Sequence, residues 1–134
     1  DLGALPDKTI WLDCDVIQAD GGTRTAAITG SFLALADALN KVVPKGPLPL
    51  YDFLAATSVG LKDNQCLLDL CYAEDSTVSV DMNLVMTDEG QIVEIQGTGE
   101  AFPFTRSDMN DLMDLAFKGI SELIQIQKKM LIDF

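Results

Sequence analysis

The chain has 134 residues, of which 48% are hydrophobic and 22% charged, and this composition is typical of one globular domain spanning residues 1–134. No apolar run approaches the ~18 residues that span a bilayer, so no membrane role is predicted. Nine basic residues against 21 acidic ones give a net charge of −12, which argues against simple electrostatic binding of nucleic acid. An RNA ligand would therefore require cations from outside this chain.

The chain begins with Asp1 rather than Met, and its first eight residues lack the pattern of a secretion signal, which suggests an internal start. Cys14, Cys66 and Cys71 have no C-x-x-C spacing, and the sequence contains no His that could complete a zinc site. We interpret the three cysteines as buried free thiols. Reduced thiols favour a cytoplasmic location.

The first predicted element is a strand at residues 8–17, where apolar residues alternate with Trp11, Asp13 and Asp15. It leads directly into a glycine pair. From Thr23 onward, dense apolar positions predict a largely buried helix that ends before Pro44. Three prolines and a glycine at residues 44–49 then indicate a loop.

The middle of the chain predicts four strands, at residues 53–61, 65–72, 80–87 and 91–97. Residues 62–64 and 88–90 have the length and composition of hairpin connections between two pairs of these strands.

An amphipathic helix follows, with Thr105 as N-cap, Asp108 three residues later, and an end near Lys129. Its apolar stripe is expected to be core. The order βαββββα predicts an α+β fold, a two-layer sandwich of a mostly antiparallel sheet with two helices on it.

A first group of candidate site residues is Asp20-Gly21-Gly22-Thr23-Arg24, between the first predicted strand and helix. The glycines allow close backbone approach, and the helix start offers unpaired N–H groups. The Thr23 hydroxyl and the Arg24 guanidinium add further donors, so inorganic phosphate would fit. From spacing alone, a glycine turn with Asp20 as helix cap and Arg24 in a surface ion pair is equally open.

A second group consists of acidic residues, namely Asp69, Asp75 and Asp81. Asp81 begins a predicted strand and Asp75 precedes it, so their carboxylates could meet at one end of the sheet and hold Mg²⁺. Crowding would raise the pKa of one carboxyl and suit it to general acid catalysis. Solvated loop acids, and a structural role for Asp69 within its strand, are the alternatives. Residues 96–100 could bring Glu100 to the same end, or simply form a glycine-rich exit loop.

Taken together, these segments resemble the ribonuclease PH family. Residues 12–25 resemble the phosphate-site motif of that family nearly throughout. Residues 74–76, 81–83 and 93–98 resemble its acidic-site strands in order and spacing. The similarity extends over residues 9–130, and the combination is far more specific than any one motif.

The resemblance implies that Gly22, Thr23 and Arg24 bind inorganic phosphate, and that Asp75 and Asp81 act at the catalytic centre as general acid or as ligands of Mg²⁺ or a similar cation. It also implies a phosphorolytic 3′→5′ exoribonuclease, a tRNA nucleotidyltransferase. Such enzymes trim RNA 3′ ends, especially those of tRNA precursors. Phosphate is the attacking group, nucleoside diphosphates are released, and the reverse reaction adds nucleotides.

Members of this family are about twice as long, and their preceding segment resembles a second copy of the same unit, with a further phosphate-site arginine and much basic surface. We therefore expect this chain to be the C-terminal half, to require the missing N-terminal half, and to form composite sites in a homohexameric ring. Two other interpretations are a non-catalytic RNA-binding or scaffold subunit of an exosome-like ring, which would tend to lack the acid pair, and a polynucleotide phosphorylase domain.

Overall fold

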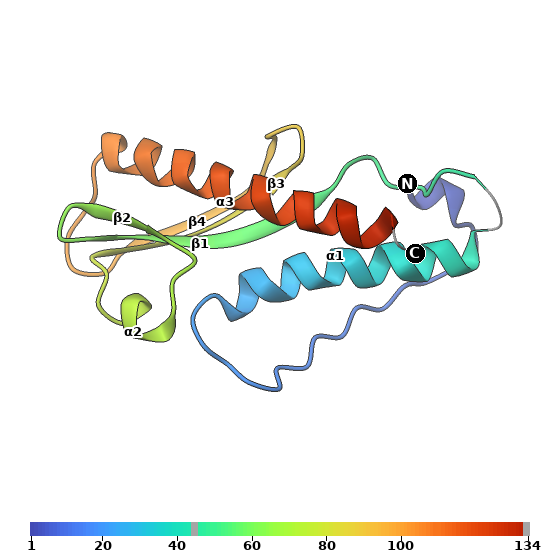
Figure 1. The fold of residues 1–134 in the computed structure, drawn as a ribbon, viewed down its shortest axis with the longest axis horizontal. Coiled ribbons are helices and arrows are strands. Elements are labelled where there is room, and N and C mark those ends of the chain that lie inside the picture. Colours follow the sequence, from blue (N-terminus) through green and yellow to red (C-terminus); the bar gives the residue numbers. More distant parts are fainter. Residues whose placement is uncertain (44–45, 133–134) are drawn as a thin grey trace.

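The computed structural model describes residues 1–43 and 46–132. Within these residues, two long helices pack against a four-stranded antiparallel sheet (Figure 1). The elements in chain order are η1 (Leu2–Ala4), α1 (Thr23–Val42), β1 (Leu54–Lys62), β2 (Gln65–Leu68), α2 (Tyr72–Asp75), β3 (Val80–Thr87), β4 (Ile92–Gly99) and α3 (Arg106–Ile132). The predicted α+β class with an antiparallel sheet is confirmed.

The strands are ordered β2-β1-β3-β4, and both predicted hairpins are present. Between β1 and β2, Asp63 and Asn64 have φ of 50° and 61°, as a two-residue turn requires when its twist matches that of the strands. Between β3 and β4, Gly90 has φ of 78°, a conformation that glycine adopts without steric cost. In the register of the sheet, Asp81 of β3 lies between Gly60 of β1 and Thr98 of β4.

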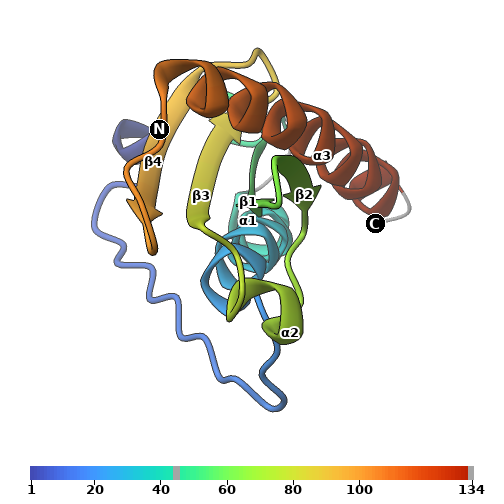
Figure 2. The same cartoon turned by 90° about the vertical axis from the view of Figure 1, so that its left-hand side faces the viewer.

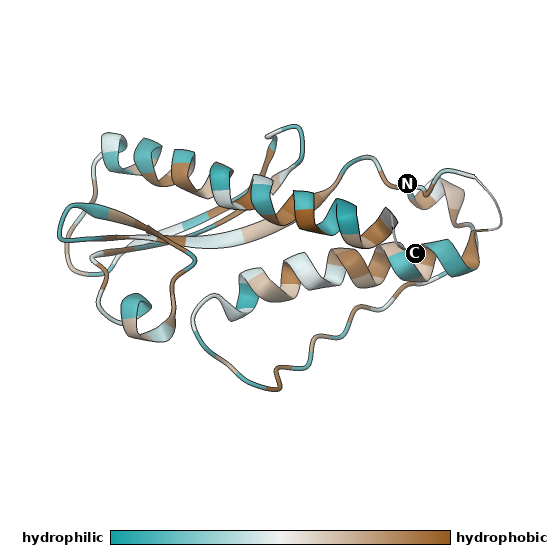
Figure 3. Ribbon diagram, in the orientation of Figure 1, coloured by the Kyte–Doolittle hydropathy of each residue, from teal (hydrophilic) through white to brown (hydrophobic). Residues whose placement is uncertain are grey.

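One face of the sheet is covered by α3 and forms the main core. Figure 3 shows hydrophilic and hydrophobic bands alternating along this helix. Its apolar residues recur every three or four positions and pack on alternate residues of β1 and β3, the buried set being Leu112, Ala116, Ile120, Ile124, Ala55, Val59, Met82 and Leu84. Each fully buried Leu or Ile side chain contributes about 1.5–3 kcal/mol relative to an exposed one.

The start of α3 is the predicted one. The Thr105 hydroxyl accepts a hydrogen bond from the Asp108 N–H at 3.1 Å, and the Asp108 carboxylate accepts one from the Thr105 N–H at 2.8 Å. This reciprocal arrangement satisfies two backbone donors at the helix end. The Thr105 cap that the sequence predicts is therefore confirmed.

The other long helix, α1, lies against the opposite face of the sheet. Ala56 and Ser58 of β1 alternate with the residues under α3 and point toward α1. Arg24 of α1 forms an ion pair with Glu94 of β4. Glu94 pairs with Val85 of β3, which points away from α3, so this ion pair also lies on the α1 face of the sheet. Figure 2 shows α3 above the strands and α1 below them. The two helices thus divide between the faces instead of sharing one layer.

Both helices also meet at an open edge of β1. Because β2 pairs only with the second half of β1, no strand among the described residues lies beside the backbone from Leu54 to Ser58 on that edge. The Thr29 hydroxyl replaces the missing strand, donating to the Ala56 carbonyl at 3.1 Å and accepting from its N–H at 3.0 Å. The Gln127 amide, only 1% exposed, donates to the Leu54 carbonyl at 2.9 Å. Side chains thereby satisfy polar groups that burial would otherwise penalise.

Two sequence predictions are corrected here. Residues 8–17 are extended and exposed but form no strand, because no ladder partner lies beside them in the part of the chain that is described. The predicted strand 65–72 ends at Leu68, since Asp69 has φ of 57° and Tyr72 begins α2. Within the predicted loop 44–49, residues 44 and 45 lie outside the described residues, and the remainder is irregular.

The cysteines are free, but they are not buried as predicted. Cys14 and Cys71 are exposed and Cys66 is half-buried. Burial, with the nearby charges of Asp111 and Asp108, raises the pKa of the Cys66 thiol, which keeps it protonated. Among the described residues, no helix combines the length and the apolar character that a membrane span requires.

Candidate active site

The turn before α1 is pressed against the loop that leads into α2. A Cβ atom on Gly21 would lie 2.0 Å from the Leu70 carbonyl oxygen, so only glycine allows this approach. The Asp20 carboxylate strengthens the contact by accepting hydrogen bonds from the Tyr72 N–H at 2.6 Å and the Gly21 N–H at 2.8 Å. These two bonds, chiefly the one from Tyr72, lower the pKa of Asp20. Asp20 thus joins the turn to α2 and does not cap α1.

The first turn of α1 retains unpartnered backbone donors. Gly22 is the N-cap, with φ of 66°, and as glycine it has no side chain that could accept from the following N–H groups. The Thr23 hydroxyl donates to the Asp20 carbonyl at 3.0 Å and can still accept a hydrogen bond. The Thr25 hydroxyl turns back to the Gly22 carbonyl at 2.8 Å. Such a helix start, with its partial positive charge, favours an anion.

Arg24 is held by Glu94 of β4 in a two-point ion pair, with N···O distances of 2.8 and 2.9 Å. The side chains are 51% and 40% exposed, so solvent weakens the attraction. Their hydrogen bond and opposite charges raise the pKa of Arg24 and lower that of Glu94. The surface ion pair that the sequence left open is therefore present, although its partner was not foreseen.

The acidic group lies at the end of the sheet where β3 begins. Asp75 is the last residue of α2, and Asp81 follows six residues later, on β3. The pKa of Asp81 is raised, first by its burial and then by the negative charges of Asp75 and Glu100. The structure therefore brings Asp75 and Glu100 within electrostatic reach of Asp81. Glu100, a weaker candidate from sequence, belongs to this group.

The cationic and acidic groups share one face of the sheet. Asp81 pairs with Thr98 on β4, and Glu94, the partner of Arg24, lies four residues before Thr98 on the same strand. Residues an even number apart point to the same face, and four strand residues span roughly 13 Å. The Asn83–Gln96 pair lies between the two groups on that face.

Not every predicted site residue joins this arrangement. Thr23 and Arg24 line two different clefts, of about 390 and 420 Å³, which share Cys14 and Ala27 as lining residues. Asp69 faces a third cavity, at the end of β2, and is not among the charges that act on Asp81. Glu94 was missed by the sequence reasoning, because only the strand register shows that it lies beside α1.

The donor set of the acidic group consists of carboxylates, which suit a hard cation such as Mg²⁺. Among the described residues, no three acidic, Cys or His side chains converge closely enough to form a complete cation site by themselves. Mg²⁺ commonly takes only one or two carboxylates and completes its shell with water and substrate phosphate. Asp75 and Asp81 therefore fit such an ion as a partial set of ligands.

Comparisons with known proteins bear on both groups. The family model described as "3′ exoribonuclease family, domain 2" matches residues 52–119, and the model of domain 1 of that family matches residues 1–40. Ribonuclease PH of Moorella thermoacetica is 60% identical over 136 residues, which cover 99% of this chain and 54% of that protein. The chain thus spans about half the length of this relative.

Among solved structures, the crystal structure of rice (Oryza sativa) Rrp46 is similar with a TM-score of 0.71 and 19% sequence identity. The match covers 86% of this chain and 50% of the rice chain. At this level of identity the likeness concerns the fold.

Proposed function

Since the chain belongs to the 3′ exoribonuclease family, we propose that it forms the catalytic part of a phosphorolytic 3′→5′ exoribonuclease that trims tRNA precursors. Inorganic phosphate is the attacking group and nucleoside diphosphates are the products. The 60% identity to a ribonuclease PH supports this activity. The observation that carries the proposal is the shared sheet face, where an anion-binding helix start and a crowded acid group lie along the same two strands.

Phosphate binds at the start of α1. The N–H groups after Gly22 and the Thr23 hydroxyl surround it, and the Arg24 guanidinium turns from Glu94 to the phosphate oxygens. Glu94 keeps the guanidinium on the correct face of the sheet until phosphate arrives. Because the ion pair is exposed, exchanging one oxyanion for another costs little. Positioning of the attacking group is the main contribution of this side of the site.

The reaction is an in-line displacement at the last phosphodiester of the RNA. A phosphate oxygen forms a bond to phosphorus, the bond to the 3′ oxygen of the preceding nucleotide breaks, and a nucleoside diphosphate leaves. The departing 3′ oxygen requires a proton, and Asp81 is suited to supply it, because burial and the charges of Asp75 and Glu100 raise its pKa. In the alternative role, Asp75 and Asp81 would hold Mg²⁺, which would offset negative charge on the reacting phosphates.

RNA binding also requires positive charge from outside this chain, and exposed apolar side chains indicate a surface that a partner covers. The net charge of −12 repels RNA, and Arg24 is one of only two arginines in the sequence. Ile17 is fully exposed, Trp11 is 82% exposed, and Val93 on the edge strand β4 is 60% exposed. We assign this uncovered surface to an N-terminal half with a second phosphate-site arginine. The domain 1 match over residues 1–40 supports this, because residues 8–17 would find ladder partners there. The complete enzyme assembles as a ring of six in the cytoplasm.

The test is a phosphorolysis assay on the intact protein with a tRNA that carries extra 3′ nucleotides. Nucleoside diphosphate release should require phosphate and should fall at least ~100-fold in Arg24→Ala and in Asp81→Asn. Two matched controls should keep their activity, Arg106→Ala as the other arginine and Asp114→Asn as an exposed acid on α3. Full activity of either Arg24→Ala or Asp81→Asn would refute the role that we assign to that residue. Release of nucleoside monophosphates without phosphate would refute phosphorolysis.

The two other functions considered make different predictions, one for this assay and one for the length of the intact protein. A non-catalytic subunit of an exosome-like ring would bind RNA without releasing nucleotides, and the retained acid pair argues against it. A polynucleotide phosphorylase would release the same products, but its chain would carry additional RNA-binding domains, which the length of the intact protein reveals.

A further inference from the structure

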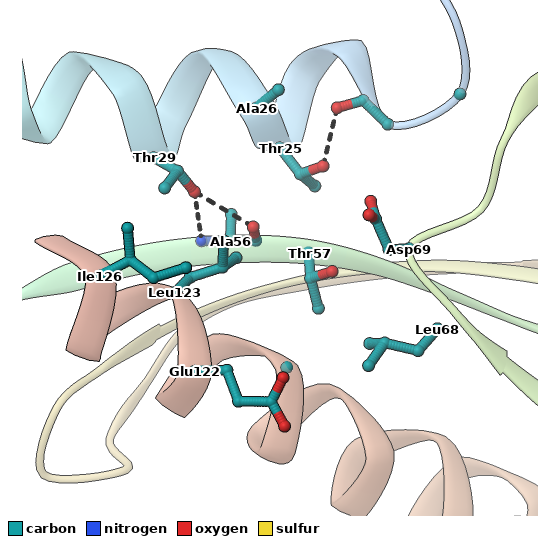
Figure 4. Close-up of a pocket in the computed structure, with 13 residues that line it drawn as sticks. Thr25, Ala26, Thr29, Ala56, Thr57, Leu68, Asp69, Glu122, Leu123 and Ile126 are labelled. Atoms are coloured by element: carbon teal, nitrogen blue, oxygen red, sulfur yellow. Dashed lines mark hydrogen bonds between the residues drawn. The ribbon is translucent and has the colours of Figure 1, made fainter.

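A cavity of about 450 Å³ lies between α1 and α3, beside the open edge of β1 (Figure 4). Its walls come from the start of α1, from β1, from the end of β2 and from the middle of α3. This size falls within the ~300–1,000 Å³ range of small-molecule sites. Thr23, Arg24, Asp75 and Asp81 do not line it, whereas Gly21 and Gly22 of the turn before α1 do, so the cavity adjoins the proposed active site without containing its charged residues.

Much of the cavity wall is apolar. Leu68 of β2 and Leu123 and Ile126 of α3 are the large apolar side chains in it. Gly119 permits this arrangement, because a Cβ atom there would lie 2.7 Å from a methyl group of Leu68. An aliphatic chain in the cavity would remove this surface and its own from water.

Three polar groups interrupt the apolar wall. Asp69 and Glu122 are exposed carboxylates that form no ion pair with any residue the structure describes. The Thr57 side chain is only 4% exposed, and its hydroxyl makes one hydrogen bond of 3.5 Å, at the outer limit of such bonds. Figure 4 shows the two carboxylates on either side of Thr57. The Thr57 hydroxyl oxygen donates to the Ser58 carbonyl and can still accept a hydrogen bond from a ligand in the cavity.

The backbone at Asp69 supports the same conclusion. Asp69 has φ of 57°, a left-handed conformation that few residues other than glycine adopt. Its N–H donates to the Ser58 carbonyl at 2.8 Å, which holds the residue at the cavity wall. Local strain at a residue that lines a cavity is frequent where the side chain is needed for binding.

We propose that this cavity binds a small aliphatic amine as its ammonium form. The ammonium group has three donors and no acceptor, which matches the carboxylates of Asp69 and Glu122 and the hydroxyl of Thr57. Its alkyl chain lies against Leu123 and Ile126. The net charge of −12 concentrates cations around the protein, whereas an anion would be repelled by both carboxylates.

The experiment measures binding of n-pentylamine and of n-pentanol to the intact protein by ligand-observed NMR and calorimetry. The two probes have nearly the same shape, and only the amine is charged at neutral pH. We expect saturable binding of one amine per chain, with pentanol at least fivefold weaker. The double variant Asp69→Asn, Glu122→Gln should weaken amine binding at least tenfold. Asn tolerates the left-handed backbone at position 69, so the fold is retained.

Asp114→Asn is the matched control, since it removes one exposed acid from the same helix as Glu122. It should bind the amine like the unmodified protein. Equal affinity for amine and alcohol, or equal weakening by the control, would refute a specific ammonium site, and so would failure to saturate. The comparison of the two probes needs no variant, so the proposal stays testable even if the double variant unfolds.

Discussion

Replacing Gly21 with alanine should detach the turn before α1, the proposed phosphate site, from the loop before α2. The new Cβ atom would lie 2.0 Å from the Leu70 carbonyl oxygen and 2.7 Å from the Cys71 carbonyl carbon. Both atoms belong to the backbone, which would have to move by more than 1 Å to reach van der Waals separation. Overpacking of this kind costs about 1–3 kcal/mol, and we expect the upper end of that range. The Asp20 contact to Tyr72 would be lost at the same time.

Gly30→Ala is the matched control for this substitution. Gly30 lies inside α1, is exposed, and would place its new Cβ atom in open space. Alanine is favoured over glycine by about 0.5–1 kcal/mol in a helix interior, so this variant should gain stability. Denaturant unfolding measures both changes, and phosphate binding should be lost only in Gly21→Ala. If both variants changed the free energy of unfolding by the same amount, the packing argument would be wrong.

Three further substitutions test other parts of the structure. Asp81→Asn should be more stable than the unmodified protein at neutral pH, because Asp81 is charged there although the fold raises its pKa. Urea unfolding at a series of pH values should show this gain in stability disappear as acid protonates Asp81. A difference in stability that does not depend on pH would contradict the prediction. Glu94→Gln should lower the half-saturating phosphate concentration severalfold, because the Glu94 carboxylate would no longer compete with phosphate for Arg24. Weaker phosphate binding would instead indicate that Glu94 only positions Arg24. Thr29→Val should cost about 1–3 kcal/mol in thermal unfolding by leaving the Ala56 backbone unpaired, whereas Thr29→Ser should restore it.

Elements with strong local signals could be predicted from the sequence. The predicted strand 80–87 coincides with β3, and the last helix begins at its Thr105 cap and extends three residues beyond Lys129. Period-two alternation, helical spacing and a capping pair are properties of consecutive residues. Neighbouring chain segments are not needed to recognise them.

Elements that depend on distant partners could not be predicted. Residues 8–17 have the alternation of a strand, but a strand exists only beside another strand. Residues 65–72 look continuous, yet Asp69 adopts a left-handed backbone while its N–H pairs with Ser58. That choice depends on a contact eleven residues earlier in the chain, which no local pattern contains.

The candidate site divides in the same way. The residues from Gly22 to Arg24 are consecutive, and Asp75 and Asp81 are six apart, so a motif can record both groups. The ion pair from Arg24 to Glu94 joins residues 70 positions apart. It depends on the register of β3 and β4 and on the face that α1 occupies, neither of which composition or spacing defines.

A single partner surface would relieve several unfavourable features of this chain. Asp81 is half-buried beside two further acids, and Arg24, the cation nearest to the phosphate site, is occupied by Glu94. Apolar side chains on β4 and on residues 8–17 face water. Departures from local design rules concentrate at functional sites because binding offsets them. A partner surface that is basic at its centre and apolar at its rim would neutralise Asp81 and its neighbouring acids. The same surface would cover the exposed apolar side chains of β4 and of residues 8–17, so one partner suffices for both.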